Sequence, residues 1–428
     1  MTHIRRFTAA LTAALLLPLP VFASPAGNVP AAGASDTVAQ ASDAPAVVAN
    51  AEVPLSMADR LQELQDFSDR HDSELDRQGS LLQQLDRALA PSFNGSLGVR
   101  YQFASTFAAP AIANLPQTRL RLGIQSRQPG PFRYEVRLVT GATDLPNQSW
   151  VPFGAFWGKT PIALDRYNLS WRPVQPFTLT AGKFSDPFAN SELLWDNDVQ
   201  PQGLLQSLSL DQWLPASMKA NVDVGELVMA ANGSDSGAYA IGGKLSLSQQ
   251  ATPWLKLDGS VGYYDFINAQ AMATPNLSLG ARPTLALRNR LDASGTRLLN
   301  DFNLLNVFAR ASIDVFPDVP LRLTADHVIN MASPDQNRGL RLGAFIGSVK
   351  DPGGVMGVYR FKYLESDSTI SAFAEDIIGG TDVVAHEVSV TGRLLPRTFV
   401  EGTVQMLNRL STAGAPLWHF RLAFLQEF

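Results

Sequence analysis

Short runs of alternating apolar and polar residues fill the chain from position 91 to the carboxyl terminus. Arg119 and Arg121, for example, alternate with Leu120 and Leu122. Successive side chains of a strand point to opposite faces, so each run predicts a strand with one apolar and one charged face. Similar alternation occurs in residues 133–138, 166–172, 321–326, 359–363 and 418–428.

The turn residues between these runs allow the strands to be counted. Seven short turns with Pro or Gly alternate with eight longer polar connections, which predicts sixteen antiparallel strands. The run Thr369 to Glu375 looks like a further strand, but counting it would break the alternation, so we place it in a loop. The short turns lie near 129–131, 173–176, 214–215, 252–253, 317–320, 351–354 and 395–396. The longer connections are 105–116, 142–160, 185–200, 231–236, 267–300, 331–337, 365–381 and 410–415.

Composition favours a membrane barrel over a soluble sandwich. Charged residues make up 17% of the chain, whereas about 25% is typical of soluble proteins. After the amino terminus we find no apolar stretch of about 20 residues that could span a bilayer as a helix. Alternating strands then place the apolar face toward lipid and the charged face toward a watery lumen, and sixteen strands are wide enough to leave a channel.

The first 90 residues follow a different pattern. Residues 1–23 read as a secretory signal, and residues 24–54 as a disordered linker rich in Ala, Pro and Gly. Leucines spaced by three and four in residues 55–90 predict a periplasmic helix that forms a coiled coil. A single amphipathic helix is the alternative, because three polar residues occupy the middle of the stripe.

The third long connection, 185–200, combines carboxylates with large apolar side chains. We expect it to fold into the barrel and to face the basic residues of the early strands, because its apolar residues need a packing surface. Opposed acidic and basic rows across a pore would form a selectivity filter. The alternatives are an outer loop capped by Asx turns and, more weakly, a calcium site. The candidate residues are Asp186, Glu192, Asp196 and Asp198 on the loop, and Arg100, Arg119, Arg121, Arg133 and Arg137 on the wall.

Several motifs resemble the putative porin family of Gram-negative outer membranes. They are Leu179–Phe184, Asp186–Phe188, Trp195–Asp198 and Pro201–Gly203, followed by Tyr363–Glu365, Ala372-Phe373 and Gly379–Asp382 before His386-Glu387. The resemblance covers most of residues 93–428 and implies an outer-membrane β-barrel channel, often preceded by a periplasmic coiled segment. Gln426 departs from the apolar or aromatic residue that such a terminal strand is expected to carry.

The function predicted from these features is an outer-membrane porin for passive diffusion of small hydrophilic solutes or ions, with loop 185–200 as its constriction. The alternative is a structural or adhesive barrel that binds envelope partners. A coiled coil would support a homotrimer. The chain has no cysteine, which excludes thiolate metal sites. Its net charge of -5 argues against a general nucleic-acid binder. We predict no enzymatic activity and no cofactor, and interpret His327 and His386 as interface or rim residues.

Overall fold

In the computed structural model the chain forms two units, residues 1–70 and residues 71–428, and the barrel belongs to the second. The predicted signal, the linker and nearly all of the predicted helix lie outside the described residues. Of that helix, the structure describes Arg77 and Gly79, which are both helical. The described residues are 77, 79, 90–105, 112–126, 130–141, 149–154, 158–188, 190–230, 237–270, 288–295, 297–316, 319–374, 380–412 and 414–428.

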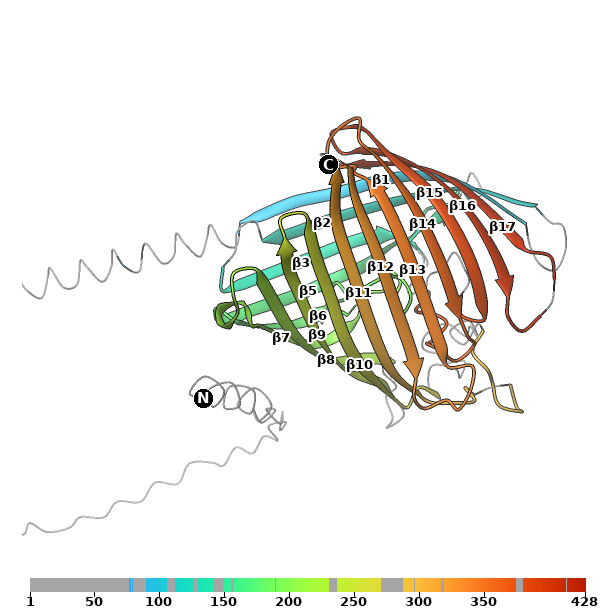
Figure 1. Ribbon diagram of the computed structural model, residues 1–428, viewed down its shortest axis with the longest axis horizontal. Helices are drawn as coiled ribbons and strands as arrows, with labels where there is room; N and C mark the ends of the chain where they lie inside the picture. Colours follow the sequence, from blue (N-terminus) through green and yellow to red (C-terminus); the bar gives the residue numbers. More distant parts are fainter. Residues whose placement is uncertain are drawn as a thin grey trace, which may run out of the picture. The chain divides into compact units, whose positions relative to one another are not determined.

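Strands make up almost all of the regular structure in the described part of the chain (Figure 1). The strands of the first half are β1 (Pro91–Ser105), β2 (Ile112–Ser126), β3 (Phe132–Thr140), β4 (Val151–Pro152), β5 (Ile162–Val174), β6 (Phe177–Lys183), β7 (Gln202–Ser209), β8 (Met218–Ala230) and β9 (Ala238–Thr252). Those of the second half are β10 (Leu255–Ile267), β11 (Phe302–Phe316), β12 (Val319–Asn330), β13 (Arg338–Gly347), β14 (Val355–Leu364), β15 (Val383–Leu395), β16 (Thr398–Arg409) and β17 (Leu417–Glu427). A single turn of 3₁₀ helix, η1 (Asp211–Trp213), lies between β7 and β8.

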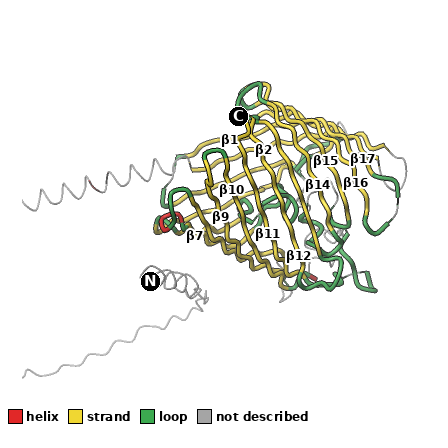
Figure 2. The backbone as a smooth tube through the Cα atoms, in the orientation of Figure 1, coloured by secondary structure: helices red, strands yellow, loops and turns green. Residues whose placement is uncertain are grey.

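The sheet closes on itself because β1 pairs with both β2 and β17, and every pairing is antiparallel (Figure 2). Seventeen strands belong to the sheet, but β4 has only two residues and pairs with β2 beside the longer β3. Strand β3 pairs directly with β5, so β4 does not count as a separate strand of the barrel wall. The closed wall therefore has sixteen strands, as the turn pattern predicts.

The connections match the predicted short and long classes only in part. The predicted short connection between β7 and β8, residues 210–217, is longer than the predicted long one between β8 and β9, residues 231–237, and β2 already begins at Ile112, inside the predicted connection 105–116. Pairs of strands such as β5–β6, β9–β10 and β15–β16 are joined by two residues, whereas β10 and β11 are separated by residues 268–301. The described residues of the connection 365–382, which include Thr369 to Ala374, form turns and no strand. Placing that run in a loop is therefore correct.

The two faces of the wall differ in the way that the alternation predicts. Leu169 is 53% exposed and Phe420 is 43% exposed on the outer face. On the inner face, Arg121 and Arg137 pair with Asp198 and Asp165. In water such an apolar outer surface would be unfavourable, whereas in a bilayer it is in contact with lipid. Among the described residues, no helix has the length and apolar character needed to cross a membrane.

A hydrophobic core lies inside the barrel. It forms where the connection between β6 and β7, which we call loop 184–201, packs on the inner faces of several strands. The loop contributes Phe184, Phe188, Leu193, Leu194, Trp195 and Val199, and the wall contributes residues such as Leu227, Tyr264, Phe266 and Leu304. This core positions the loop in the lumen and so determines the geometry of the candidate site.

Candidate functional site

Two glycines that face each other in β6 and β7 flank loop 184–201. Gly182 and Gly203 form a register pair with φ of 117° and 154°. A Cβ atom at either position would collide with a backbone oxygen of the adjacent strand. Glycine is the residue that adopts such angles without steric cost. These two positions therefore allow the chain to leave β6 and return to β7 at close quarters.

Aromatic side chains hold the loop against the inner wall. Trp195 is 1% exposed, and its ring centroid lies 5.2 Å from that of Phe373, 6.0 Å from Phe266 and 6.4 Å from Tyr264. Phe188 meets Tyr264 edge to face at 5.2 Å. Burial of these large rings is strongly favourable. The prediction that the apolar residues of the loop need a packing surface is met by the inner face of β10 and by residue 373.

Polar contacts fix the loop at further points around the wall. The Asn190 side chain donates a 3.0 Å hydrogen bond to Asn306 of β11, and the Ser191 hydroxyl donates to Asp326 of β12. On the other side, Asp198 pairs with Arg121 of β2 and accepts a hydrogen bond from Ser149. Strands on opposite parts of the wall are thus linked through the loop.

Two of the four candidate acids also cap the loop locally. Asp186 accepts a 2.7 Å hydrogen bond from the backbone N–H of Phe188, and Asp196 accepts one of 2.7 Å from that of Asp198. Both are Asx turns, so the local capping of the alternative interpretation is present, but in a loop that lies inside the barrel. Asp196 is only 5% exposed, so much of its carboxylate serves the loop itself.

Three of the acids and three of the arginines line one cavity of about 490 Å³. Glu192, Asp196 and Asp198 border it from the loop, and Arg100, Arg119 and Arg121 border it from β1 and β2. Residues from β14 to β17, including Arg360, Glu401 and Arg421, complete its lining. The acidic and basic rows that the sequence suggests are therefore brought together across this space.

The remaining candidates lie elsewhere. Asp186 is not part of the cavity lining. Arg137 pairs with Asp165 and borders a separate cavity near the carboxyl terminus. Arg133 is exposed on β3 and lines none of the described cavities. Arg133 and Arg137 are therefore not among the arginines that border the cavity beside the loop, because the inward direction of a side chain does not fix its depth in the barrel.

A smaller cavity of about 170 Å³ adjoins the other side of the loop. Four arginines from successive strands line it together with Asn190, Ser191, Glu192 and Asn197. They are Arg310 of β11, Arg322 of β12, Arg341 of β13 and Arg360 of β14. None of these four arginines is among the site residues predicted from the sequence. Alternation along each strand indicates that these side chains point inward. It does not indicate that they lie near the loop, because that depends on the tertiary structure.

Glu192 borders both cavities and pairs with Arg341 at 3.3 Å. Burial acts to raise the pKa of this carboxyl, but Arg341, Lys362 and Arg360 act in the opposite direction and leave the pKa below its ordinary value. The Asn197 side chain also donates a 2.6 Å hydrogen bond to Glu192. The loop therefore presents a negative charge between the two arginine-lined spaces at neutral pH.

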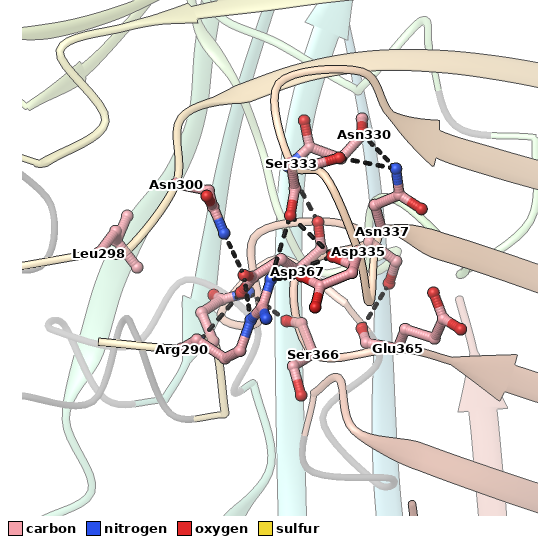
Figure 3. A network of polar contacts seen from close by, with 12 residues as sticks. Arg290, Leu298, Asn300, Asn330, Ser333, Asp335, Asn337, Glu365, Ser366 and Asp367 are labelled. Atoms are coloured by element: carbon pink, nitrogen blue, oxygen red, sulfur yellow. Dashed lines mark hydrogen bonds and ion pairs between the residues drawn. The ribbon is translucent and has the colours of Figure 1, made fainter. Parts of the chain in front are cut away.

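A polar network ties three long connections together at their end of the barrel (Figure 3). Arg290 donates to the buried carboxylate of Asp367 at 2.7 Å and pairs with Asp335 at 2.7 Å. Asn300 donates a 2.8 Å hydrogen bond to the same Asp367. The carboxylates raise the pKa of Arg290 against the effect of its burial. The connections 268–301, 331–337 and 365–382 are thus held to one another.

The three histidines in the described part of the chain, His327, His386 and His419, lie on three different strands, β12, β15 and β17. His386 lies on the outer face and makes a 2.9 Å hydrogen bond with the Tyr359 hydroxyl. His327 is exposed between Val307 and Leu340 in register. Within the described part of the chain, no group of three or more His, Asp or Glu side chains is placed to hold a metal ion. The calcium interpretation of the loop therefore has no geometric support in these segments.

The profile of the family described as putative porin matches residues 93–289. The resemblance is confirmed over that range, and the later motifs between Tyr363 and Glu387 lie outside the match. The fold is similar to that of Pseudomonas putida OprB, with a TM-score of 0.52, 10% identity, and coverage of 82% of this chain and 97% of that one. Salmonella typhi OmpF in complex with daunomycin gives a TM-score of 0.49, 12% identity, and coverage of 80% and 99%. No curated protein sequence matches. The family match favours the porin prediction over the structural or adhesive alternative.

Proposed function

We propose that this barrel, which carries the putative porin match in residues 93–289, is an outer-membrane channel for passive diffusion of small hydrophilic solutes or ions. One observation carries the proposal: the closed wall is apolar outside and charged inside, and a cavity of about 490 Å³ lies between the inserted loop and that charged wall. Sixteen strands enclose a lumen too wide to be filled by wall side chains alone.

Loop 184–201 forms the constriction in this proposal. Its backbone and side chains occupy lumen that the wall leaves open, so solutes pass beside it and are sorted by size. Charge is sorted in the same place, because Glu192 and Asp198 border the cavity opposite Arg100 and Arg119. In a narrow passage an ion lies closer to these fixed charges than the Debye length, which is about 8 Å at physiological ionic strength. Salt therefore screens the charges only weakly, and they act strongly on the ion.

The orientation and assembly follow from the same proposal. Barrels of this class place short turns in the periplasm and long loops outside the cell. The linked connections 268–301, 331–337 and 365–382 would then face the exterior, and residues 55–90 would form the periplasmic helix. A coiled coil formed by those residues would join the subunits of a homotrimer, although their mixed core positions do not specify the number of strands in the coil.

Electrical recording across a planar lipid bilayer tests the proposed function. Purified, folded protein is expected to add current in discrete steps, because each inserted barrel opens one aqueous path. The control is the same preparation unfolded by heat. Silence from protein whose sheet signal and compact gel migration show a folded barrel would support the structural or adhesive alternative instead.

A further inference from the structure

The arginines that line the two cavities beside loop 184–201 outnumber the carboxylates. Eight arginines and five carboxylates border these spaces. Most of the arginines are held by a carboxylate, which cancels much of their charge. The pairs are Arg121–Asp198, Arg310–Asp258, Arg341–Glu192, Arg360–Glu387 and Arg421–Glu401.

Arg119 is held in a different way. Its guanidinium lies 4.5 Å from the centre of the Trp150 ring, and that of Arg100 lies 4.6 Å from the same ring. No carboxylate among the described residues pairs with Arg119, and its buried Nε has no hydrogen-bond partner there. Gly98 makes room for the ring, since a Cβ atom at that position would come within 2.6 Å of Trp150.

The second cavity repeats this arrangement on other strands. The guanidinium of Arg322 lies 5.2 Å from the centre of the Phe345 ring, and that of Arg360 lies 5.4 Å from it. Arg322 has no carboxylate partner among the described residues. Gly343 again leaves space for the ring, because a Cβ atom there would come within 2.9 Å of Phe345. Each cavity therefore contains one arginine that rests on an aromatic ring in place of an acid.

An aromatic ring and a carboxylate hold a guanidinium with different consequences. A carboxylate attracts the cation and neutralises it, whereas a ring attracts it through its quadrupole and leaves the net charge in place. The planar donor group then remains available for a bidentate bond to an oxyanion. Holding the side chain in advance also lowers the entropic cost of binding.

We propose that Arg119 and Arg322 form two anion subsites, one in each cavity, and that they make the passage prefer small oxyanions such as carboxylates and phosphate. This inference rests on the proposed channel function and adds the class of solute. An anion would lie between the ring-held arginine and its neighbours, Arg100 and Arg121 in the first cavity and Arg310 and Arg341 in the second.

Reversal potentials in a potassium chloride gradient give the first test. The unaltered protein is expected to pass chloride in preference to potassium. The double variant Arg119→Gln, Arg322→Gln should lower that permeability ratio by about threefold or more, which is the size of effect that loss of one unit charge has on an ion at about 5 Å in water. Arg172→Gln is the matched control, because Arg172 bonds to Thr178 and lines neither cavity. Arg119→Lys keeps the charge and should retain most of the preference.

Block of the chloride current by added oxyanions gives the second test. Inorganic phosphate and acetate are titrated separately, and each should reduce the current in a saturable way that weakens in the double variant. Block by both indicates a general oxyanion subsite, and block by phosphate alone indicates a site for the more highly charged ion. Trp150→Leu keeps every charge but removes the ring, so it should weaken the block and serves if the double variant does not fold.

The possible failures are distinguishable. A folded barrel that carries no current overturns the proposed function itself. A channel that conducts but prefers potassium, or whose ratio is the same in the double variant as in the unaltered protein, overturns the anion subsites and leaves the channel in place.

Discussion

Replacement of Trp195 by alanine should loosen loop 184–201 and enlarge the passage. The ring is buried against Phe373, Phe266 and Tyr264 at centroid distances of 5.2 to 6.4 Å. Truncation of a buried tryptophan to alanine typically costs about 3 to 5 kcal/mol. Nearly all of that cost falls on docking of the loop, because the sixteen-stranded wall keeps its own hydrogen bonds. The equilibrium between docked and undocked loop should then shift by more than about a hundredfold.

The polar contacts of Asn190, Ser191 and Asp198 remain in this variant, so the loop should fluctuate between arrangements. Single-channel recording is expected to show larger and noisier current steps. Liposome swelling with sugars of increasing size should show a larger size limit. Trp213→Ala is the matched control, because Trp213 is 52% exposed in the short connection that contains η1. Steps and size limit identical to those of the unaltered protein, in a folded barrel, would refute the role of the loop as the constriction.

Three further predictions follow from the charged residues of the site and of the polar network around Arg290. Asp198→Asn should free Arg121 from its ion pair and shift the permeability ratio further toward anions. An unchanged reversal potential would show that Arg121 and Asp198 lie away from the route that ions take. Because the pKa of Glu192 is lowered, its pairing with Arg341 should stabilise loop docking at and above its ordinary pKa of about 4.3 and be lost as pH falls through the lower folded value. Channel noise should therefore rise only in acid, whereas Glu192→Gln should show that noise at neutral pH; noise that rises equally in both proteins would implicate another group. Arg290→Gln should release the three linked connections, lower the unfolding temperature of the barrel and make these connections more sensitive to protease. Unchanged protease resistance would show that Arg290 does not hold the connections together.

The turns explain why so much of the wall is predictable. Turn chemistry is local, so two-residue connections such as Gln175-Pro176 and Pro253-Trp254 can be located without knowledge of the rest of the fold. The inward or outward direction of a side chain is equally local, because it follows from alternation along one strand. Both kinds of inference hold for the sixteen strands, and the two-residue β4 is missed because it has no alternation to detect.

The site depends on information that alternation does not contain. Arg121 and Arg133 both point inward, but only Arg121 lies at the depth where loop 184–201 crosses the lumen. Depth is fixed by register and tilt across the whole sheet, so Arg133 could not be excluded from the sequence. Trp150 likewise lies in a long connection, and nothing in its neighbourhood along the chain indicates that Arg100 and Arg119 will rest on its ring.

Thiol labelling tests the central claim, an aqueous path through the barrel beside the loop. The chain has no cysteine, so a single one can be introduced without background. Asn197→Cys places a thiol on the loop at the edge of both cavities, and Leu169→Cys places one on the outer face. A charged, water-soluble thiol reagent is predicted to reduce the single-channel current of the Asn197 variant and to leave that of the Leu169 variant unchanged. A reagent that leaves the current of the Asn197 variant unchanged but reacts with the thiol at position 169 would contradict an aqueous path beside the loop.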